Sequence, residues 1–199
     1  MLTAPLANAQ ANGPNSARDE LIIVTDCADL PVVDPNTTSG GATVTIRDAG
    51  NCVTTSGDTI NLQDDNQDQI RINFVNTTVT NTDGDDEDVV VFQDNSENFL
   101  TVFVDSDSSL IGTDGVIFIE GDAARIRNEG LISNQGGGAT EGAIYIDRDT
   151  DGNPNFINNG VGATIQSLNG GPAIGIETLV ADGTTGCLLY TSPSPRDRG

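Results

Sequence analysis

The 199-residue chain carries 30 acidic residues against 8 basic ones, and its formal net charge of −22 repels phosphate backbones, so nucleic acid is not an expected partner. It has no histidine, which excludes a Ser-His-Asp triad, a Cys-His pair and a histidine-containing zinc site within these residues. Aromatic residues make up only 4%, so the core must bury many small Val, Ile and Leu side chains, which suits a long, thin core.

The N terminus resembles the end of a signal peptide. Residues 1–11 are small and mostly apolar, and Ala7-Asn8-Ala9 has the A-x-A pattern that signal peptidase accepts, because its pocket admits only small side chains at those two positions. We interpret residues 1–11 as a signal-peptide remnant that is cleaved after Ala9 or Ala11, which predicts export. The alternative is a flexible N-terminal tail.

Residues 12–60 are predicted to form an N-terminal capping region that contains a disulfide and covers the open edge of the strands that follow. Cys27 and Cys52 are an even pair once Cys187, which lies in an atypical C-terminal tail, is set aside. An exported chain reaches an oxidising compartment, where a structural disulfide persists. The bridge would close a loop of about 25 residues and stabilise the fold by about 3 kcal/mol in the chain-entropy model.

From residue 42 onward, short β-rich runs alternate with Gly, Asn and Asp. Several of the runs show the period-two alternation of a strand, whereas helical periodicity is not convincing and the many Gly, Asn and Asp residues would weaken a helix. The sequence therefore predicts an all-β protein. The clearest strand-like runs are residues 43–46, 59–62, 70–74, 89–92 and 100–104.

The second half of the chain repeats itself. Gly115–Glu120 matches Gly142–Asp147 and, more loosely, Pro172–Glu177, while residues 126–133 match residues 157–167. The period of about 26 to 33 residues is typical of solenoids, in which each coil stacks its inward Ile and Val on those of its neighbours. We predict a truncated β-solenoid over residues 61–186. The alternative is a β-sandwich, which would not require the repeated Gly-x-Ile-x-Ile block.

Two further features follow from the repeat. Asp88–Phe92 reads as a degenerate earlier copy of the Gly-x-Ile-x-Ile block. Asn128 and Asn158 occupy similar places in their repeats, so their side chains are predicted to form a hydrogen-bond ladder along the stack.

One segment resembles a calcium loop. Carboxylates alternate in Asp147-Arg-Asp-Thr-Asp-Gly-Asn153 and glycine stands at the sixth position, although Asn158 replaces the bidentate acid of the twelfth. The hypothesis is a calcium site, and the alternative is a solvated turn between coils. No other cofactor is expected, and the acidic turns at Asn81–Asp88 and Asp105–Asp107 are predicted to be exposed loops. The proposed calcium ligands are Asp147, Asp149, Asp151 and Asn153.

Over residues 110–186, the Ile-x-Asn-(x)-Gly-x-Ile pattern followed by Gly-x-Ile resembles the passenger region of bacterial autotransporters and related surface β-helix proteins. The resemblance implies a signal peptide and a passenger exposed outside the outer membrane of a Gram-negative bacterium. It also implies a C-terminal β-barrel of the same parent chain, which is expected outside residues 1–199. The expected role is structural or adhesive, with an extracellular ligand or surface as the partner.

Two alternatives to this role remain open. A polysaccharide-active β-helix enzyme would use paired carboxylates or an arginine base. No carboxylate pair stands out, and Arg125 and Arg127 serve equally well as salt-bridge partners, so we do not expect an enzyme. A calcium-stabilised extracellular module is the other alternative.

The C-terminal tail differs sharply from what precedes it. Residues 187–199 contain two of the eight arginines and lose the Gly/Asn/Ile rhythm. They resemble translated read-through of a sequencing adapter, which predicts that the natural sequence is lost after about Gly186. The alternative is a natural proline-rich tail.

Overall fold

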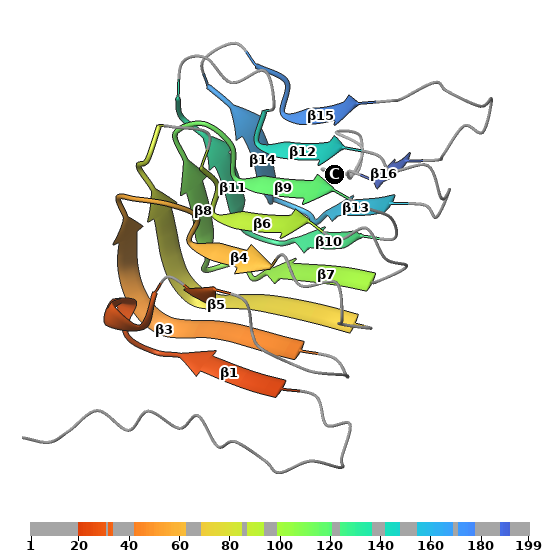
Figure 1. The fold of residues 1–199 in the computed structure, drawn as a ribbon. Helices are drawn as coiled ribbons and strands as arrows, with labels where there is room; N and C mark the ends of the chain where they lie inside the picture. Colours follow the sequence, from red (N-terminus) through yellow and green to blue (C-terminus); the bar gives the residue numbers. More distant parts are fainter. Residues whose placement is uncertain are drawn as a thin grey trace, which may run out of the picture.

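Short parallel strands stack into a coiled column in the computed structural model (Figure 1). Every strand pairing is parallel among the residues that the structure describes. The predicted β-solenoid is therefore confirmed, and the alternative β-sandwich is wrong, because sandwiches are built from antiparallel sheets. The described residues are 20–30, 32–33, 42–62, 69–84, 87–93, 99–120, 124–136, 142–147, 155–168, 171–177 and 188–191.

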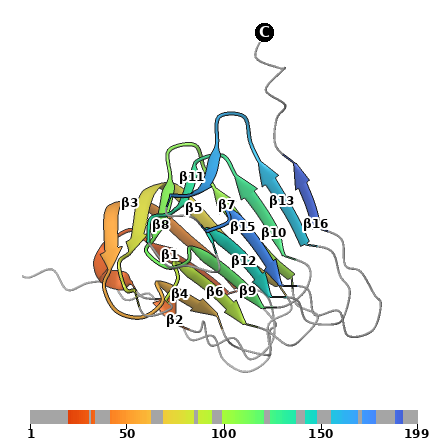
Figure 2. The same cartoon turned by 90° about the horizontal axis from the view of Figure 1, so that it is seen from above.

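Three strand faces run along the column, and Figure 2 looks down on the stacked coils. The first face contains β1 (Glu20–Val24), the N-terminal halves of β3 (Ala42–Thr54) and β5 (Gln69–Asn81), β7 (Phe99–Val104), β10 (Arg125–Asn128), β13 (Asn155–Asn159) and β16 (Leu188–Thr191). The second face contains the C-terminal halves of β3 and β5, β8 (Ser109–Gly112), β11 (Leu131–Asn134) and β14 (Thr164–Ser167). The third face contains β2 (Val32–Val33), β4 (Ile60–Leu62), β6 (Val90–Gln93), β9 (Ile117–Glu120), β12 (Ile144–Asp147) and β15 (Ile174–Glu177).

The repeated blocks of the sequence lie directly above one another on the third face. Ile117 of β9, Ile144 of β12 and Ile174 of β15 are in register, 27 and 30 residues apart. Val90 of β6 is in register with Ile117, so the degenerate earlier copy at Asp88–Phe92 is confirmed. The spacing varies because the connections differ in length while the inward apolar positions keep their register.

The core is a set of apolar columns that run along the stack. Successive strand residues point to opposite sides, so one set of side chains faces inward and the other faces out. On the first face, Val44, Ile72, Val102, Ile126 and Ile157 form one inward column, and each is at most 2% exposed. One coil cannot bury such a column alone, so its stability depends on its neighbours.

The long strands β3 and β5 each bend from the first face into the second. The bends are at Asp48 and Asn76, whose φ angles of 51° and 48° are left-handed, a conformation that Asn and Asp tolerate better than most residues. The Asn76 side-chain amide donates to Oδ1 of Asp48 at 2.8 Å, and its backbone N–H donates to Oδ2 of Asp105 at 3.0 Å. These bonds link one corner of the column through three successive coils.

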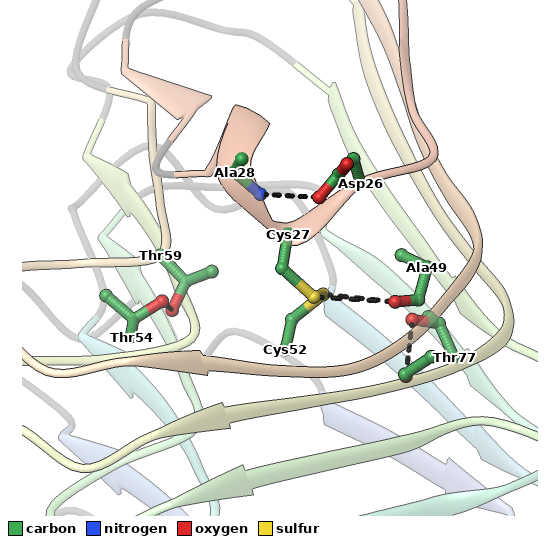
Figure 3. Close-up of a disulfide and its surroundings, with 9 residues drawn as sticks. Asp26, Cys27, Ala28, Ala49, Cys52, Thr54, Thr59 and Thr77 are labelled. Carbon is green, nitrogen blue, oxygen red and sulfur yellow. Dashed lines mark hydrogen bonds between the residues drawn. A yellow bond between two sulfur atoms is a disulfide. The ribbon is translucent and has the colours of Figure 1, made fainter.

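A disulfide joins Cys27 to Cys52, which is the pairing predicted from the cysteine count (Figure 3). Cys27 begins the short 3-10 helix η1 (Cys27–Asp29), and the side chain of Asp26 accepts a hydrogen bond from the N–H of Ala28 at 3.0 Å. The bridge ties η1 to β3 of the next coil. Strands β1 to β3 lie within residues 12–60 and already belong to the stack, so the predicted capping region is itself part of the solenoid.

Removing this bridge should loosen the first coil. We expect a Cys27→Ala/Cys52→Ala variant to lose about 3 kcal/mol of unfolding free energy, because the bridge closes a loop of 25 residues in the unfolded chain. Hydrogen exchange should rise most in β1, which among the described residues pairs only with β3. The matched control is Cys187→Ser, which leaves the bridge intact. Equal melting temperatures for the double variant and this control would contradict the expectation.

Candidate functional site

The predicted calcium loop is only partly within the described residues. Asp147 ends β12, where it is in register with Glu120 of β9 and Glu177 of β15, whereas Asp149, Asp151 and Asn153 lie outside the described residues. Its in-register neighbours are therefore acidic residues of adjacent coils. No group of three or more His, Cys, Asp or Glu residues within the described part of the chain is arranged to hold a metal ion. The calcium hypothesis stays a prediction.

The two other acidic turns differ from each other. Asp107 is exposed, as predicted, but the expectation of an exposed loop is wrong for Asn81 and Asp88, which are 0% and 4% exposed. The Asn81 side-chain amide donates to the carbonyl oxygens of Gly57 at 3.0 Å and Asp88 at 2.8 Å. Asn81 thus satisfies buried backbone acceptors where two coils meet, which is a structural role.

The asparagine ladder is present, but its predicted partner is wrong by one residue. The side-chain amide of Asn128 donates to Oδ1 of Asn159 at 2.8 Å and to the carbonyl oxygen of Thr164 at 3.0 Å. Asn158 is in register with Arg127 and is exposed. A shift of one residue moves a strand side chain to the opposite side, so Asn159 points inward and Asn158 points out.

The outer surface of the first face differs in charge from the rest of the chain. The first-face segments of β3, β5, β7, β10 and β13, which are residues 42–47, 69–75, 99–104, 125–128 and 155–159, contain no Asp or Glu. They contain every arginine of the described residues, at outward, exposed positions. These arginines are Arg47, Arg71, Arg125 and Arg127, and we call this surface the arginine face.

The register of the strands holds two of these arginines against aromatic rings. Arg125 is in register with Phe156, and its guanidinium carbon lies 5.5 Å from the centre of that ring. Arg127 is in register with Phe103 on the other neighbouring strand, at 5.4 Å. Such cation–π contacts restrict the guanidinium while leaving its N–H groups able to donate hydrogen bonds.

Within the described part of the chain, one of these four arginines forms an ion pair with an acidic residue. Arg127 forms an ion pair with Glu129. Arg47, Arg71 and Arg125 have no carboxylate partner among the residues that the structure describes, although the chain contains 30 acidic residues. A planar guanidinium can bind a carboxylate or a phosphate through two parallel hydrogen bonds, so this surface can bind an anion.

Sequence reasoning treated Arg125 and Arg127 only as salt-bridge partners or as a possible base, and did not single out Arg47 or Arg71. The signal that finds them is local alternation. Ile70-Arg71-Ile72 and Arg125-Ile126-Arg127 place arginines at the outward positions of strands whose inward positions are apolar. The register that brings the two segments to one face is not visible in either of them.

Comparison of this chain with models of protein families, with curated proteins and with solved structures finds no match. Among the described residues, no helix has the length and apolar character needed to cross a membrane.

Proposed function

We propose that this chain is the N-terminal fragment of an exported bacterial β-solenoid, displayed at the cell surface or secreted, with a structural or adhesive role like that of autotransporter passengers. The observation that carries the proposal is the arginine face, a group of outward arginines on β3, β5 and β10 of an otherwise strongly acidic protein. The Cys27–Cys52 bridge supports export, because such bridges persist in oxidising compartments. A solenoid offers an extended surface on which many weak contacts can add up.

Display of the whole chain on a bacterium tests this role. The chain is placed between a signal peptide and an outer-membrane anchor, and cells are allowed to settle on coated wells. We expect the displayed chain to resist protease, to have Cys27 and Cys52 blocked against thiol alkylation, and to increase adherence. Shortening of a polysaccharide coating would support the enzyme alternative instead. A protease-resistant, displayed chain that leaves adherence unchanged on every coating would contradict the adhesive role.

We also propose that residues 187–199 do not belong to the natural protein. Leu188–Thr191 form β16, which pairs with β13. An open strand edge accepts another β-forming segment through backbone hydrogen bonds, so this pairing does not require a natural sequence. Sequencing of the source locus across the codon for Gly186 is the test. A reading frame that continues through further Gly/Asn/Ile repeats is the expected result, and a frame that continues through residues 187–199 as written would overturn the proposal.

A further inference from the structure

We infer that the arginine face binds a linear polysaccharide that carries carboxylate groups, such as a polyuronate, lying across the strands along the solenoid axis. The inference rests on the proposed adhesive role and gives it a ligand class. It concerns binding only, and no chemical step is assigned to this surface.

The positions of the arginines that have no carboxylate partner among the described residues favour an anionic ligand. Arg71, Thr101 and Arg125 form one outward column in register across β5, β7 and β10. Neighbouring strands are about 4.8 Å apart, so the two arginines of this column are separated by roughly 10 Å. Neither has a carboxylate partner among the described residues, and no acidic residue lies in the intervening strand β7. The separation between Arg71 and Arg125 suits a ligand whose negative charges recur at regular intervals along an extended polymer.

The side chains around the arginines favour a sugar polymer over other anions. Besides the rings of Phe103 and Phe156, the outward residues of this surface include several hydroxyl and amide groups. The side-chain amide of Asn73 donates to the hydroxyl oxygen of Thr45 at 3.2 Å. Thr, Asn and Arg can donate to and accept from sugar hydroxyls and ring substituents. The neutral polar residues of this surface are Thr43, Thr45, Asn73, Thr101 and Asn158.

Two other classes of partner fit less well. A protein interface needs a desolvated apolar centre, whereas Phe103 and Phe156 are half-buried and each has an arginine against its ring. A double-stranded nucleic acid carries one negative charge about every 1.7 Å along its axis, a far closer spacing than the roughly 10 Å between Arg71 and Arg125, so two separated arginines would leave most of its phosphates without a partner. A polyuronate carries its charges on separate sugar rings and places hydroxyl groups between them, which matches the alternation of Arg and Thr.

The test measures binding of the purified full chain to polygalacturonate by calorimetry, in low salt with a chelator that removes calcium. We expect saturable binding that weakens as salt is added, and no binding to the fully methyl-esterified polymer, whose backbone is the same but uncharged. Arg71→Gln/Arg125→Gln should weaken binding at least about tenfold, because hydrogen bonds to two charged partners are lost. Arg125→Lys should also weaken binding, because lysine keeps the charge but not the two-donor geometry.

The matched control is Val53→Glu/Val161→Glu, which makes the same change in net charge at two exposed positions away from the arginine face, 53% and 87% exposed. An equal loss of binding in this control would overturn the inference, because net charge alone would then explain the effect. Equal binding of the methyl ester, or of single-stranded DNA, would also overturn it. So would light scattering that shows a second copy of the chain as the partner, through self-association that the arginine substitutions abolish.

The same variants separate this inference from the proposed adhesive role. If displayed cells carrying Arg71→Gln/Arg125→Gln adhere as well as the wild type on every coating, the glycan site is wrong while the adhesive role stands. If the purified chain binds polygalacturonate through these arginines but its display never promotes adherence, the binding site stands and the adhesive role is wrong.

Discussion

An Asn128→Asp variant is expected to lose about 3 to 5 kcal/mol of unfolding free energy at neutral pH, the usual cost of leaving a buried charge without a partner. Asn128 is fully buried, and its side-chain amide donates to Oδ1 of Asn159, to the carbonyl oxygen of Thr164 and, at 3.3 Å, to that of Gly130. Aspartate would replace this donor with a negatively charged oxygen that faces three acceptors. Chemical denaturation of variant and wild type gives the difference.

The unfolding free energy that Asn128→Asp loses should increase as the pH rises. Burial and the facing oxygens raise the pKa of the new carboxyl group in the folded state above the value of about 3.9 that it has in the unfolded chain. The folded state then binds the proton more tightly than the unfolded state does. Ionisation therefore takes nothing from the unfolding free energy below a pH of about 4, and its destabilising effect grows as the pH rises from there to the folded-state pKa. The matched control is Asn158→Asp, at an exposed position on β13. If both variants are equally stable at neutral pH, the inward ladder between Asn128 and Asn159 is wrong.

A Gly112→Ala variant should lose about 3 kcal/mol of unfolding free energy, which is at the upper end of the usual cost of forcing extra volume into a packed interior. A Cβ atom at Gly112 of β8 would lie 1.7 Å from the carbonyl oxygen of Gly115 and 3.2 Å from Cγ2 of Val116. The carboxylate of Asp88 occupies the place where a side chain at Gly115 would lie, which restricts how far this turn can move aside. The measurement is the denaturation midpoint, together with hydrogen exchange in β8 and β9.

The control for this variant is Gly84→Ala. Its two chain neighbours aside, no atom of the described residues lies within 4 Å of a Cβ added at Gly84, and the φ angle of Gly84 is outside the left-handed range. The same change in composition should therefore leave stability nearly unchanged or slightly improved, since alanine restricts the unfolded chain. Equal destabilisation by the two substitutions would mean that the close approach at Gly112 does not limit the packing of the coil.

The third face could be predicted from the sequence, whereas the arginine face could not. Ile117 and Ile119 recur as Ile144 and Ile146, so the repeated block identifies both the strand and its inward side. On the first face, Val102 and Ile126 are 24 residues apart but Ile126 and Ile157 are 31 apart. Because the connections vary this much, no fixed period aligns Arg71 with Arg125, and only the stacked structure brings them into one column.

The same variation explains the misplaced partner of Asn128. Residues 126–133 and 157–167 match in type but contain neighbouring asparagines, Asn158 and Asn159, and both fit a loose repeat. Inward and outward positions alternate with each residue along a strand. The register of β10 with β13 is therefore needed to decide whether Asn158 or Asn159 faces Asn128. The predicted capping region, residues 12–60, lacks the repeated block, yet its strand β1 stacks on β3 in the same parallel arrangement as the later coils.

The stacking of each coil only on its immediate neighbours also determines how the molecule would respond to tension along its axis. The backbone hydrogen bonds between coils run nearly parallel to that axis, so a pull from the end would detach coils one after another. A coil of 24 residues, such as that between Val102 and Ile126, would release roughly 80 Å of extended chain. The 25-residue segment closed by the Cys27–Cys52 bridge cannot extend in this way, because the disulfide holds its two ends together. A surface stalk built in this way would lengthen stepwise under load, with a covalent limit at its first coil.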